Sequence, residues 1–191
     1  MNGLGILLAI NLAVLLVIAL YVMVTYNRFI RLRTGAEEAW SDIEVQMKRR
    51  YNLIPNLVET VKGYAGHEKD TLERVIAARN AAMASDGRPQ DQAASENMLT
   101  GALRSLFAVA EAYPDLKANA NFLHLAEELS EVEDHIQKAR RYYNGNVREL
   151  NMAIDSFPSN LVARAFSVGK RDFFELDEAS PAREAVKVSF S

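Results

Sequence analysis

The chain has 191 residues, of which 22 are lysine or arginine and 25 are aspartate or glutamate, so its formal net charge is −3. This balance excludes the strongly basic surface that is typical of nucleic-acid-binding proteins, and no nucleic-acid partner is expected. The absence of cysteine excludes disulfides, zinc–thiolate sites and cysteine nucleophiles, although it leaves the cellular compartment open.

The first 27 residues carry no charged side chain, and Leu4 to Val24 are almost wholly leucine, isoleucine, valine, alanine and methionine. A helix of about 20 such residues crosses the ~30 Å hydrocarbon core of a bilayer. A cleaved signal peptide would instead need a basic start, a shorter apolar stretch and a small-residue cleavage site, and none is present. The sequence therefore predicts a transmembrane anchor over residues 1–27, with the lipid bilayer as its partner.

Three arginines, Arg28, Arg31 and Arg33, follow the span directly. Because basic residues flank membrane spans on the cytoplasmic side, the domain after the span is expected to be cytoplasmic. The three guanidinium groups are candidates for binding lipid headgroups, and the simpler alternative is ordinary flanking charge without lipid specificity. No proline lies between Thr25 and Gly35, so the span is predicted to continue into the next helix as one rigid lever.

Apolar residues recur every three or four positions from Ala36 to Tyr64, which predicts an amphipathic helix ended by Gly63 and Gly66. Pro55 removes one backbone donor from this helix, so a bend near Asn52 is expected.

A second helix is predicted over 70–85, with Asp70 or Thr71 as its N-cap, because the pattern resumes there and stops at an Asp-Gly-Arg-Pro break. A third is predicted over 90–112, ending before Pro114. A fourth and longest is predicted over 115–156, since the single glycine inside it, Gly145, weakens a helix without forcing a break.

These elements predict an all-α fold, in which the single transmembrane helix is followed by an antiparallel up-and-down four-helix bundle with long helices over residues 28–157. Residues 158–191 form a C-terminal tail with one short helical stretch and strand-like alternation over 186–190, and partial order is expected for it.

The densest acidic stretch spans Glu127 to Asp134 and is flanked by His124 and His135. Neither histidine has the Glu-x-x-His spacing of a di-iron bundle, so a solvated acidic face is expected and no metal site. The chain also lacks a Gly-x-Ser-x-Gly elbow, a His-Glu-x-x-His helix and a phosphate-binding glycine loop. No catalytic residue, cofactor or enzymatic activity is predicted.

Two helical stretches, 48–58 and 139–147, combine consecutive cations with tyrosine and asparagine, a composition enriched in protein interfaces. One hypothesis is that the two stretches face each other and form a partner interface. The alternative is that Tyr51 and Tyr143 face the core with bonded hydroxyls, while Arg49 and Arg140 extend past them to water. The candidates for a partner interface are Arg49, Arg50, Tyr51, Asn52, Arg140, Arg141, Tyr142 and Asn144.

Six blocks of sequence, in this order and spacing, resemble the bacterial LemA family. They are Tyr26-Asn27, Glu38-Ala39-Trp40, the run from Arg50 to Tyr64, the run from Ala110 to Asn119, Ala139-Arg-Arg-Tyr-Tyr-Asn144, and Ser156-Phe-Pro-Ser-Asn160.

The resemblance implies one N-terminal span, a cytoplasmic helical bundle and a bacterial inner-membrane location. It also implies a membrane-anchored protein of loosely defined role, with links to magnetosome membranes, envelope stress and membrane proteases, and it supplies no catalytic residues.

The leading functional hypothesis is a membrane-anchored interaction or scaffold protein that forms homo-oligomers or organises partners at the membrane surface. One alternative is an adaptor or regulator of a membrane protease or transporter. A further alternative is a membrane-remodelling protein, which would place the arginine cluster and Phe166, Phe173 and Phe174 against lipid.

Overall fold

The computed structural model describes residues 3–85 and 88–176, and every regular element in these ranges is a helix. The elements are α1 (Gly3–Lys62), α2 (Lys69–Ala84), α3 (Pro89–Glu111), α4 (Pro114–Lys117), α5 (Ala120–Asp155) and α6 (Ser159–Ala165). An all-helical protein with one long apolar N-terminal helix is therefore confirmed. The strand-like alternation expected over 186–190 lies outside the described residues.

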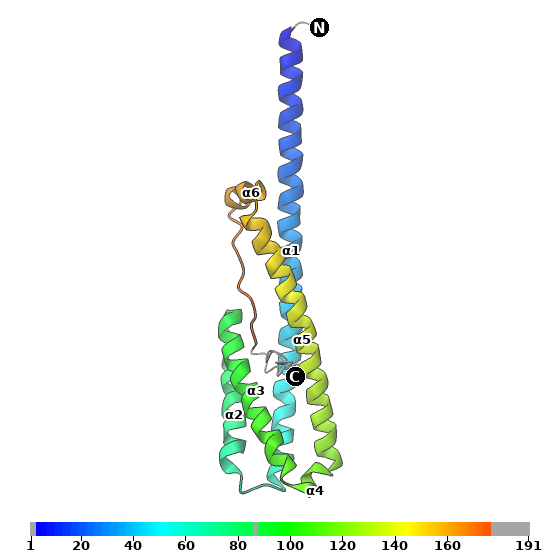
Figure 1. The fold of residues 1–191 in the computed structure, drawn as a ribbon, viewed down its shortest axis with the longest axis vertical. Coiled ribbons are helices and arrows are strands. Elements are labelled where there is room, and N and C mark those ends of the chain that lie inside the picture. Colours follow the sequence, from blue (N-terminus) through cyan, green and yellow to red (C-terminus); the bar gives the residue numbers. More distant parts are fainter. Residues whose placement is uncertain (1–2, 86–87, 177–191) are drawn as a thin grey trace, which may run out of the picture.

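Helix α1 is continuous over 60 residues, so the predicted continuity of the span with the following helix is confirmed. Its N-terminal half projects alone beyond the rest of the molecule (Figure 1). Within the described residues this is the one stretch long and apolar enough to cross a membrane, with a mean hydropathy of 2.9 over 18 residues, none of them buried. Large side chains from Leu4 to Val24 are exposed, as a lipid-facing helix requires.

Below the projecting half, α5 lies along α1, and α2 and α3 lie side by side along the lower part of the domain (Figure 1). Residues with higher numbers on α1 contact residues with lower numbers on α5. Gly35 contacts Asn146, Trp40 contacts Tyr143, and Arg50 contacts Glu133. A Cβ atom at Gly35 would lie 3.2 Å from the Asn146 side-chain oxygen, so the missing side chain lets the two helices approach closely.

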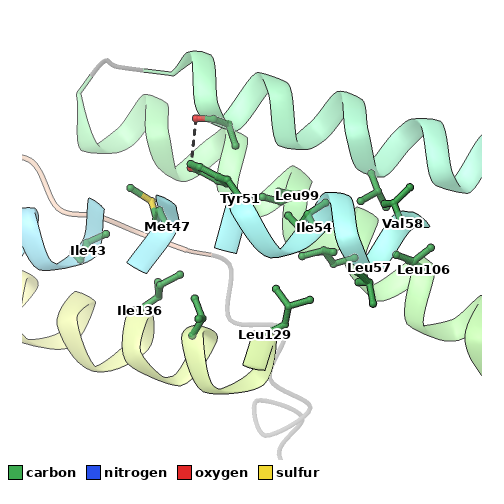
Figure 2. Close-up of a cluster of buried hydrophobic side chains, with 14 of the residues drawn as sticks. Ile43, Met47, Tyr51, Ile54, Leu57, Val58, Leu99, Leu106, Leu129 and Ile136 are labelled. Atoms are coloured by element: carbon green, nitrogen blue, oxygen red, sulfur yellow. Dashed lines mark hydrogen bonds between the residues drawn. The ribbon is translucent and has the colours of Figure 1, made fainter. Parts of the chain in front are cut away.

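The core is built around the buried stripe of α1, which meets Leu99 and Leu106 of α3 and Leu129 and Ile136 of α5 (Figure 2). A second, smaller cluster surrounds Phe29 near the end of the span and includes residues of α5 and α6. The apolar periodicity in the sequence therefore located the buried face of each long helix.

Pro55 lies inside α1 without ending it. Because proline has no N–H, the carbonyl of Tyr51 one turn earlier loses its helical donor. The Nε of Arg79, from α2, donates to this carbonyl at 2.6 Å. The backbone acceptor that proline leaves open thus becomes a contact between two helices.

The predicted bounds of the second and third helices are correct to within one residue, but the predicted N-cap of the second is wrong. The capping position is Glu68, and its side chain makes no capping hydrogen bond. Asp70 and Thr71 lie inside the first turn, because the preceding turn already bonds the Thr71 N–H to the Glu68 carbonyl.

The predicted single helix over 115–156 is also wrong, since it is divided into α4 and α5. Asn119 lies at the division, where its side-chain oxygen accepts a hydrogen bond from the Phe122 N–H at 3.0 Å and so caps α5. Asparagine favours this role because its short side chain can bond the open N–H groups of a first turn. Helix α5 passes through Gly145 without a break, as predicted.

Residues 167–176, after α6, run back along the domain as an extended segment, in which Phe174 is completely buried (Figure 1). Replacing Phe174 with alanine should lower the free energy of unfolding by about 3–5 kcal/mol, because it leaves a cavity the size of an aromatic ring. Chemical unfolding of the detergent-solubilised full chain measures this change. The matched control is Phe157→Ala, which removes an exposed ring and should change stability by less than about 0.5 kcal/mol; equal effects would contradict the assignment.

Candidate functional site

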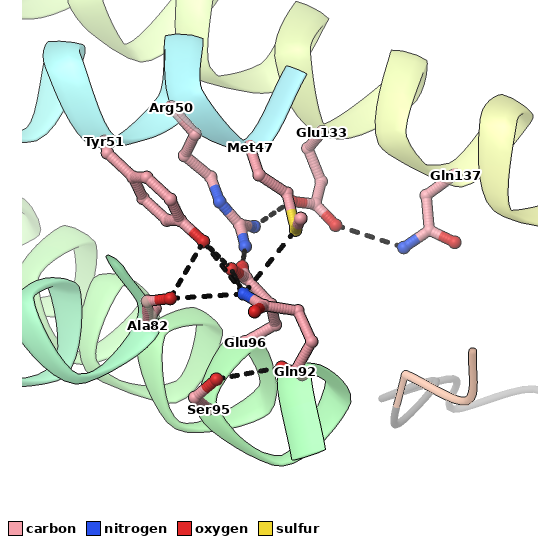
Figure 3. A network of polar contacts seen from close by, with 9 residues as sticks. All are labelled: Met47, Arg50, Tyr51, Ala82, Gln92, Ser95, Glu96, Glu133 and Gln137. Carbon is pink, nitrogen blue, oxygen red and sulfur yellow. Dashed lines mark hydrogen bonds and ion pairs between the residues drawn. The ribbon is translucent and has the colours of Figure 1, made fainter. Parts of the chain in front are cut away.

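The most concentrated polar site in the described residues is a buried ionic network where α1, α3 and α5 meet (Figure 3). The Arg50 guanidinium of α1 forms an ion pair with Glu96 of α3 and donates from Nη1 to Glu133 of α5 at 2.6 Å. Arg50 is 2% exposed and Glu96 is fully buried. One cation thus connects α3 and α5 to each other and to α1.

Two neutral groups complete the network around the Glu96 carboxylate. The Tyr51 hydroxyl donates to Glu96, and the Gln92 amide donates to the same carboxylate at 2.9 Å and to the Ala82 carbonyl at 3.2 Å. Burial raises the pKa of the Tyr51 hydroxyl, which therefore acts as a neutral donor. Hydrogen bonds from these donors replace the hydration that the Glu96 carboxylate loses when the protein folds.

Burial lowers the pKa of Arg50, while the neighbouring Glu133 carboxylate opposes that shift. Arginine nevertheless stays charged, because its ordinary pKa lies far above neutrality. A buried ion pair gains little net stability, since desolvation offsets most of the attraction, but breaking one partner is costly. The network holds no nucleophile beside a general base, and its arrangement serves to fix the relative positions of three helices.

The structure separates the two polar-aromatic stretches that were expected to face each other. Arg50 lies opposite Glu133, and Trp40 lies opposite Tyr143, so the 48–58 stretch faces residues of α5 well before 139–147. The expected pairing is wrong because each stretch has its own partner: the first contacts α3 and the acidic part of α5, and the second contacts the extended C-terminal segment.

The predicted interface residues fall into three groups by exposure. Arg50, Tyr51 and Arg140 are buried, Asn144 is half-buried, and Arg49, Asn52, Arg141 and Tyr142 are exposed. The alternative interpretation is confirmed for both tyrosines, whose hydroxyls bond Glu96 and the Asp172 carbonyl respectively. The exposed members of the set are the ones that a partner could reach.

The acidic stretch of α5 is shared between solvent and α1. Glu128 and Glu131 lie 3.8 and 3.6 Å from the Arg49 guanidinium. Glu133 departs from the expected solvated face because it reaches the buried Arg50. No group of three or more histidine, cysteine, aspartate or glutamate side chains in the described ranges is placed to hold a metal ion.

A second polar site lies on α5, where side chains bind the backbone of residues 171–176. The Asn144 amide both donates to the Phe174 carbonyl and accepts from the Phe174 N–H, at 2.9 Å each. Asn151 makes the same pair of bonds to Arg171, at 2.9 and 3.0 Å. Arg140 donates to the Leu176 carbonyl at 3.0 Å. Side chains of one helix thus bond several backbone groups of this extended segment.

An aromatic pocket accompanies these bonds. The Phe174 ring meets Trp40 edge-on with centroids 5.2 Å apart, and Trp40 also contacts Tyr143 at 5.4 Å. The sequence interpretation had placed Phe174 among the residues that meet lipid, but the ring lies in the core. The buried role follows from its position, because the asparagine bonds on α5 turn residue 174 toward Trp40.

A groove of about 610 Å³ opens between α3 and α5, beside the ionic network. Leu103 and Phe107 of α3 and Leu129 of α5 form its apolar walls, and Arg50 and Glu133 lie at its polar side. Leu176, the last described residue, also lines it. The groove combines apolar surface with charged groups, of which Arg50 and Glu133 bond each other.

The arginines after the span differ in their surroundings. Arg33 pairs with Glu37 at 3.1 Å, and this bond, together with the nearby Arg171, lowers the pKa of the Glu37 carboxyl although burial opposes the shift. Arg28 and Arg31 are exposed next to the end of the apolar stretch. These two have the placement that contact with lipid headgroups requires.

Replacing Arg50 with methionine should destabilise the protein by about 3–5 kcal/mol, because it leaves the Glu96 carboxylate buried without its cation. The double variant Arg50→Met with Glu96→Gln should recover much of that loss, since it removes both charges. Unfolding of the full chain measures both variants. Arg49→Met is the matched control, because the ion pairs of Arg49 are exposed and worth less than about 1 kcal/mol. If the destabilisation of the double variant equals the sum of the two single effects, Arg50 and Glu96 are not energetically coupled and the prediction is wrong.

Replacing Asn144 with alanine should release the backbone of Phe174, because both of its hydrogen bonds to α5 disappear. The free energy of opening at this amide should fall by about 1–3 kcal/mol, measured by hydrogen exchange. Asn146→Ala is the control, because the Asn146 amide bonds only the carbonyl of Tyr142 on its own helix among the bonds described. Unchanged exchange at Phe174 would show that the aromatic pocket alone holds the segment.

Known proteins with similar sequences include LemA and MamQ proteins of other bacteria. The chain is 28% identical over 155 residues to Protein LemA of Metamycoplasma hominis, covering 80% of this chain and 69% of the relative. It is 24% identical over 192 aligned positions to the magnetosome protein MamQ of Magnetospirillum gryphiswaldense, covering 87% and 71%. It is 25% identical over 178 positions to MamQ 2 of Paramagnetospirillum magneticum, covering 80% and 65%.

The model of one protein family matches residues 39–190, which include the ionic network, the aromatic pocket and the asparagine-bound segment. The match begins within α1, just before Trp40, and continues beyond the last described residue. This match covers most of the chain and agrees with the resemblance in the six sequence blocks, so the chain belongs to the LemA family.

Proposed function

We propose that this protein is a membrane-anchored, non-enzymatic interaction or scaffold protein that self-associates or organises partners at the surface of the bacterial inner membrane. The observation that carries this proposal is the shape of α1, whose exposed apolar half continues without a break into a folded helical domain. Anchoring confines the domain to a surface layer, which raises its effective concentration for any partner there.

For the domain itself we infer an antiparallel up-and-down four-helix bundle made of the second half of α1 with α2, α3 and α5. The order of the contacts between α1 and α5 and the short connections between successive helices support this arrangement. Such a bundle offers long outer surfaces for binding. Its main buried polar network, around Arg50 and Glu96, joins helices to one another.

For orientation we infer a single-pass protein with the helical domain in the cytoplasm. The charges support it: the described residues before Arg28 are uncharged, and Arg28, Arg31 and Arg33 follow the span. In this orientation the exposed Arg28 and Arg31 would lie among anionic headgroups of the inner leaflet.

Self-association can be tested by cross-linking in intact membranes, because the natural chain is free of cysteine. A single cysteine at Arg104, on the rim of the groove between α3 and α5, should give covalent dimers with a bis-maleimide reagent. A cysteine at the exposed Glu73 on α2 is the control and should give less of the cross-linked product. Strictly monomeric protein with both variants would contradict self-association.

A second candidate function is that of an adaptor for a membrane protease or transporter, and the groove between α3 and α5 favours it because its apolar walls could accept a segment of another protein. Charge reversal at the exposed Arg141, combined with Tyr142→Ala, should release a co-purified membrane protein while leaving cross-linked dimers intact. Truncation after Leu176 tests the remaining tail in the same assay. If every variant retains the same co-purified proteins, these surfaces do not serve as the adaptor site.

A further inference from the structure

Helix α6 lies at the end of the domain from which the apolar half of α1 projects (Figure 1). Its buried side, Val162 and Ala163, packs in the cluster around Phe29 of α1. The Phe166 ring that follows α6 contacts Tyr26 of α1, with centroids 4.8 Å apart. These contacts fix α6 beside α1 close to the end of the predicted span.

The level of α6 relative to a bilayer follows from the geometry of α1. The stretch from Leu4 to Val24 is about 30 Å long at ~1.5 Å per residue, which matches the hydrocarbon core. Tyr26 lies about 3 Å beyond Val24 on the same helix, so it would sit at the inner edge of the headgroup region. Phe166, in contact with Tyr26, would lie at that level too.

The outward side of this region is apolar. Phe157, Leu161 and Phe166 are 80%, 56% and 50% exposed, and Phe157 is the most exposed large apolar side chain in the described residues. Single exposed apolar residues are common on any surface, but these three, which we name the apolar patch, lie within ten residues of chain beside the predicted end of the span. Arg164 is exposed among them, and Lys170 pairs with Asp155 at 2.8 Å close by.

We propose that α6, with Phe157 and Phe166 on either side of it, is a second membrane contact that inserts its exposed apolar side chains into the interface of the leaflet from which α1 emerges. The proposal commits to lipid because the patch is continuous with the span through the contact between Phe166 and Tyr26. Short amphipathic elements carrying phenylalanine and leucine beside basic residues bind this region of a bilayer, with their apolar side chains at the headgroup boundary.

Such a contact would set the tilt and rotation of the domain. A single span can tilt toward any side of its own axis, whereas a second contact on one side of α1 selects tilt toward that side. The groove between α3 and α5 would then face a constant direction relative to the membrane plane. This inference rests on the membrane anchoring proposed above, and the experiment separates the two.

The test uses the full chain in vesicles of phosphatidylcholine and phosphatidylglycerol at 3:1, with an environment-sensitive fluorophore on a single cysteine. A probe at the exposed Ala165 keeps all three apolar side chains, and a probe at the exposed Ala118, at the far end of the domain, is the matched control. Lipids with a nitroxide near the headgroup should quench the Ala165 probe and leave the Ala118 probe unchanged. Aqueous iodide should quench the Ala118 probe more strongly than the Ala165 probe.

Replacing Phe157 and Leu161 with serine should reduce the lipid quenching at Ala165 without changing the helical circular dichroism, because Phe166 and the contacts of α6 with α1 remain. Equal exposure of the Ala165 and Ala118 probes to iodide, or quenching unaffected by the serine variant, would overturn the proposal. Quenching that appears only at high protein-to-lipid ratio would also overturn it, because a second copy would then cover the patch.

A third probe, at Leu12 within the span, reports the anchoring alone through nitroxides deep in the acyl chains. If Leu12 is quenched and Ala165 is not, anchoring stands and the second contact is wrong. If neither is quenched, both proposals fail.

Discussion

The continuity of α1 is the constraint on which the rest of the molecule depends. The same 60-residue helix carries the exposed apolar stretch and supplies the central stripe of the core, so neither part can move along or about the helix axis without the other. Its buried face begins at Thr25 and Phe29, directly after the apolar stretch, and runs to Val61. The height at which the core, the groove and α6 would sit above a bilayer is therefore set by residue position along one helix.

Two polar arrangements secure the other helices to α1, and both involve consecutive residues. Arg50 draws α3 and α5 together through Glu96 and Glu133, and the Tyr51 carbonyl, left open by Pro55, receives Arg79 of α2. Neither arrangement is a strong source of stability, because burying charge and polar groups costs most of what pairing returns. Their value lies in specificity: a shifted or rotated helix would leave a buried charge or carbonyl unpaired.

Periodicity in the sequence predicted the long helices and their buried faces well because both depend on neighbours three and four residues away. It missed the division at Asn119, where a single side-chain cap outweighs a continuing apolar pattern. The sequence also favoured solvent for Glu133, and the membrane-remodelling alternative placed Phe174 against lipid. Both are wrong because the partners of these residues, Arg50 and Trp40, lie far away in the chain. Such pairings depend on tertiary packing, which local pattern does not encode.

The ionic network had a signal in the sequence that the interpretation passed over. Gln92 and Glu96 occupy the same helical stripe as Leu99, Leu103 and Leu106, and a carboxylate on a core stripe requires a buried cation. Asn144 was a candidate for a partner interface, and in the structure its side chain bonds within the chain. Its role is to hold the backbone of Phe174 within the chain, and only the fold of residues 166–176 reveals it.

The claim that one unbroken helix joins the span to the domain can be measured directly in the cysteine-free chain. Spin labels at Leu16, in the span, and at Val45, in the domain, both occupy exposed positions on α1. Along a continuous helix they are separated by about 44 Å at a rise of ~1.5 Å per residue. Pulsed electron resonance on the protein in lipid nanodiscs should give a single narrow distribution near that distance. A broad distribution extending to much shorter distances would show a hinge between membrane and domain and would contradict the account.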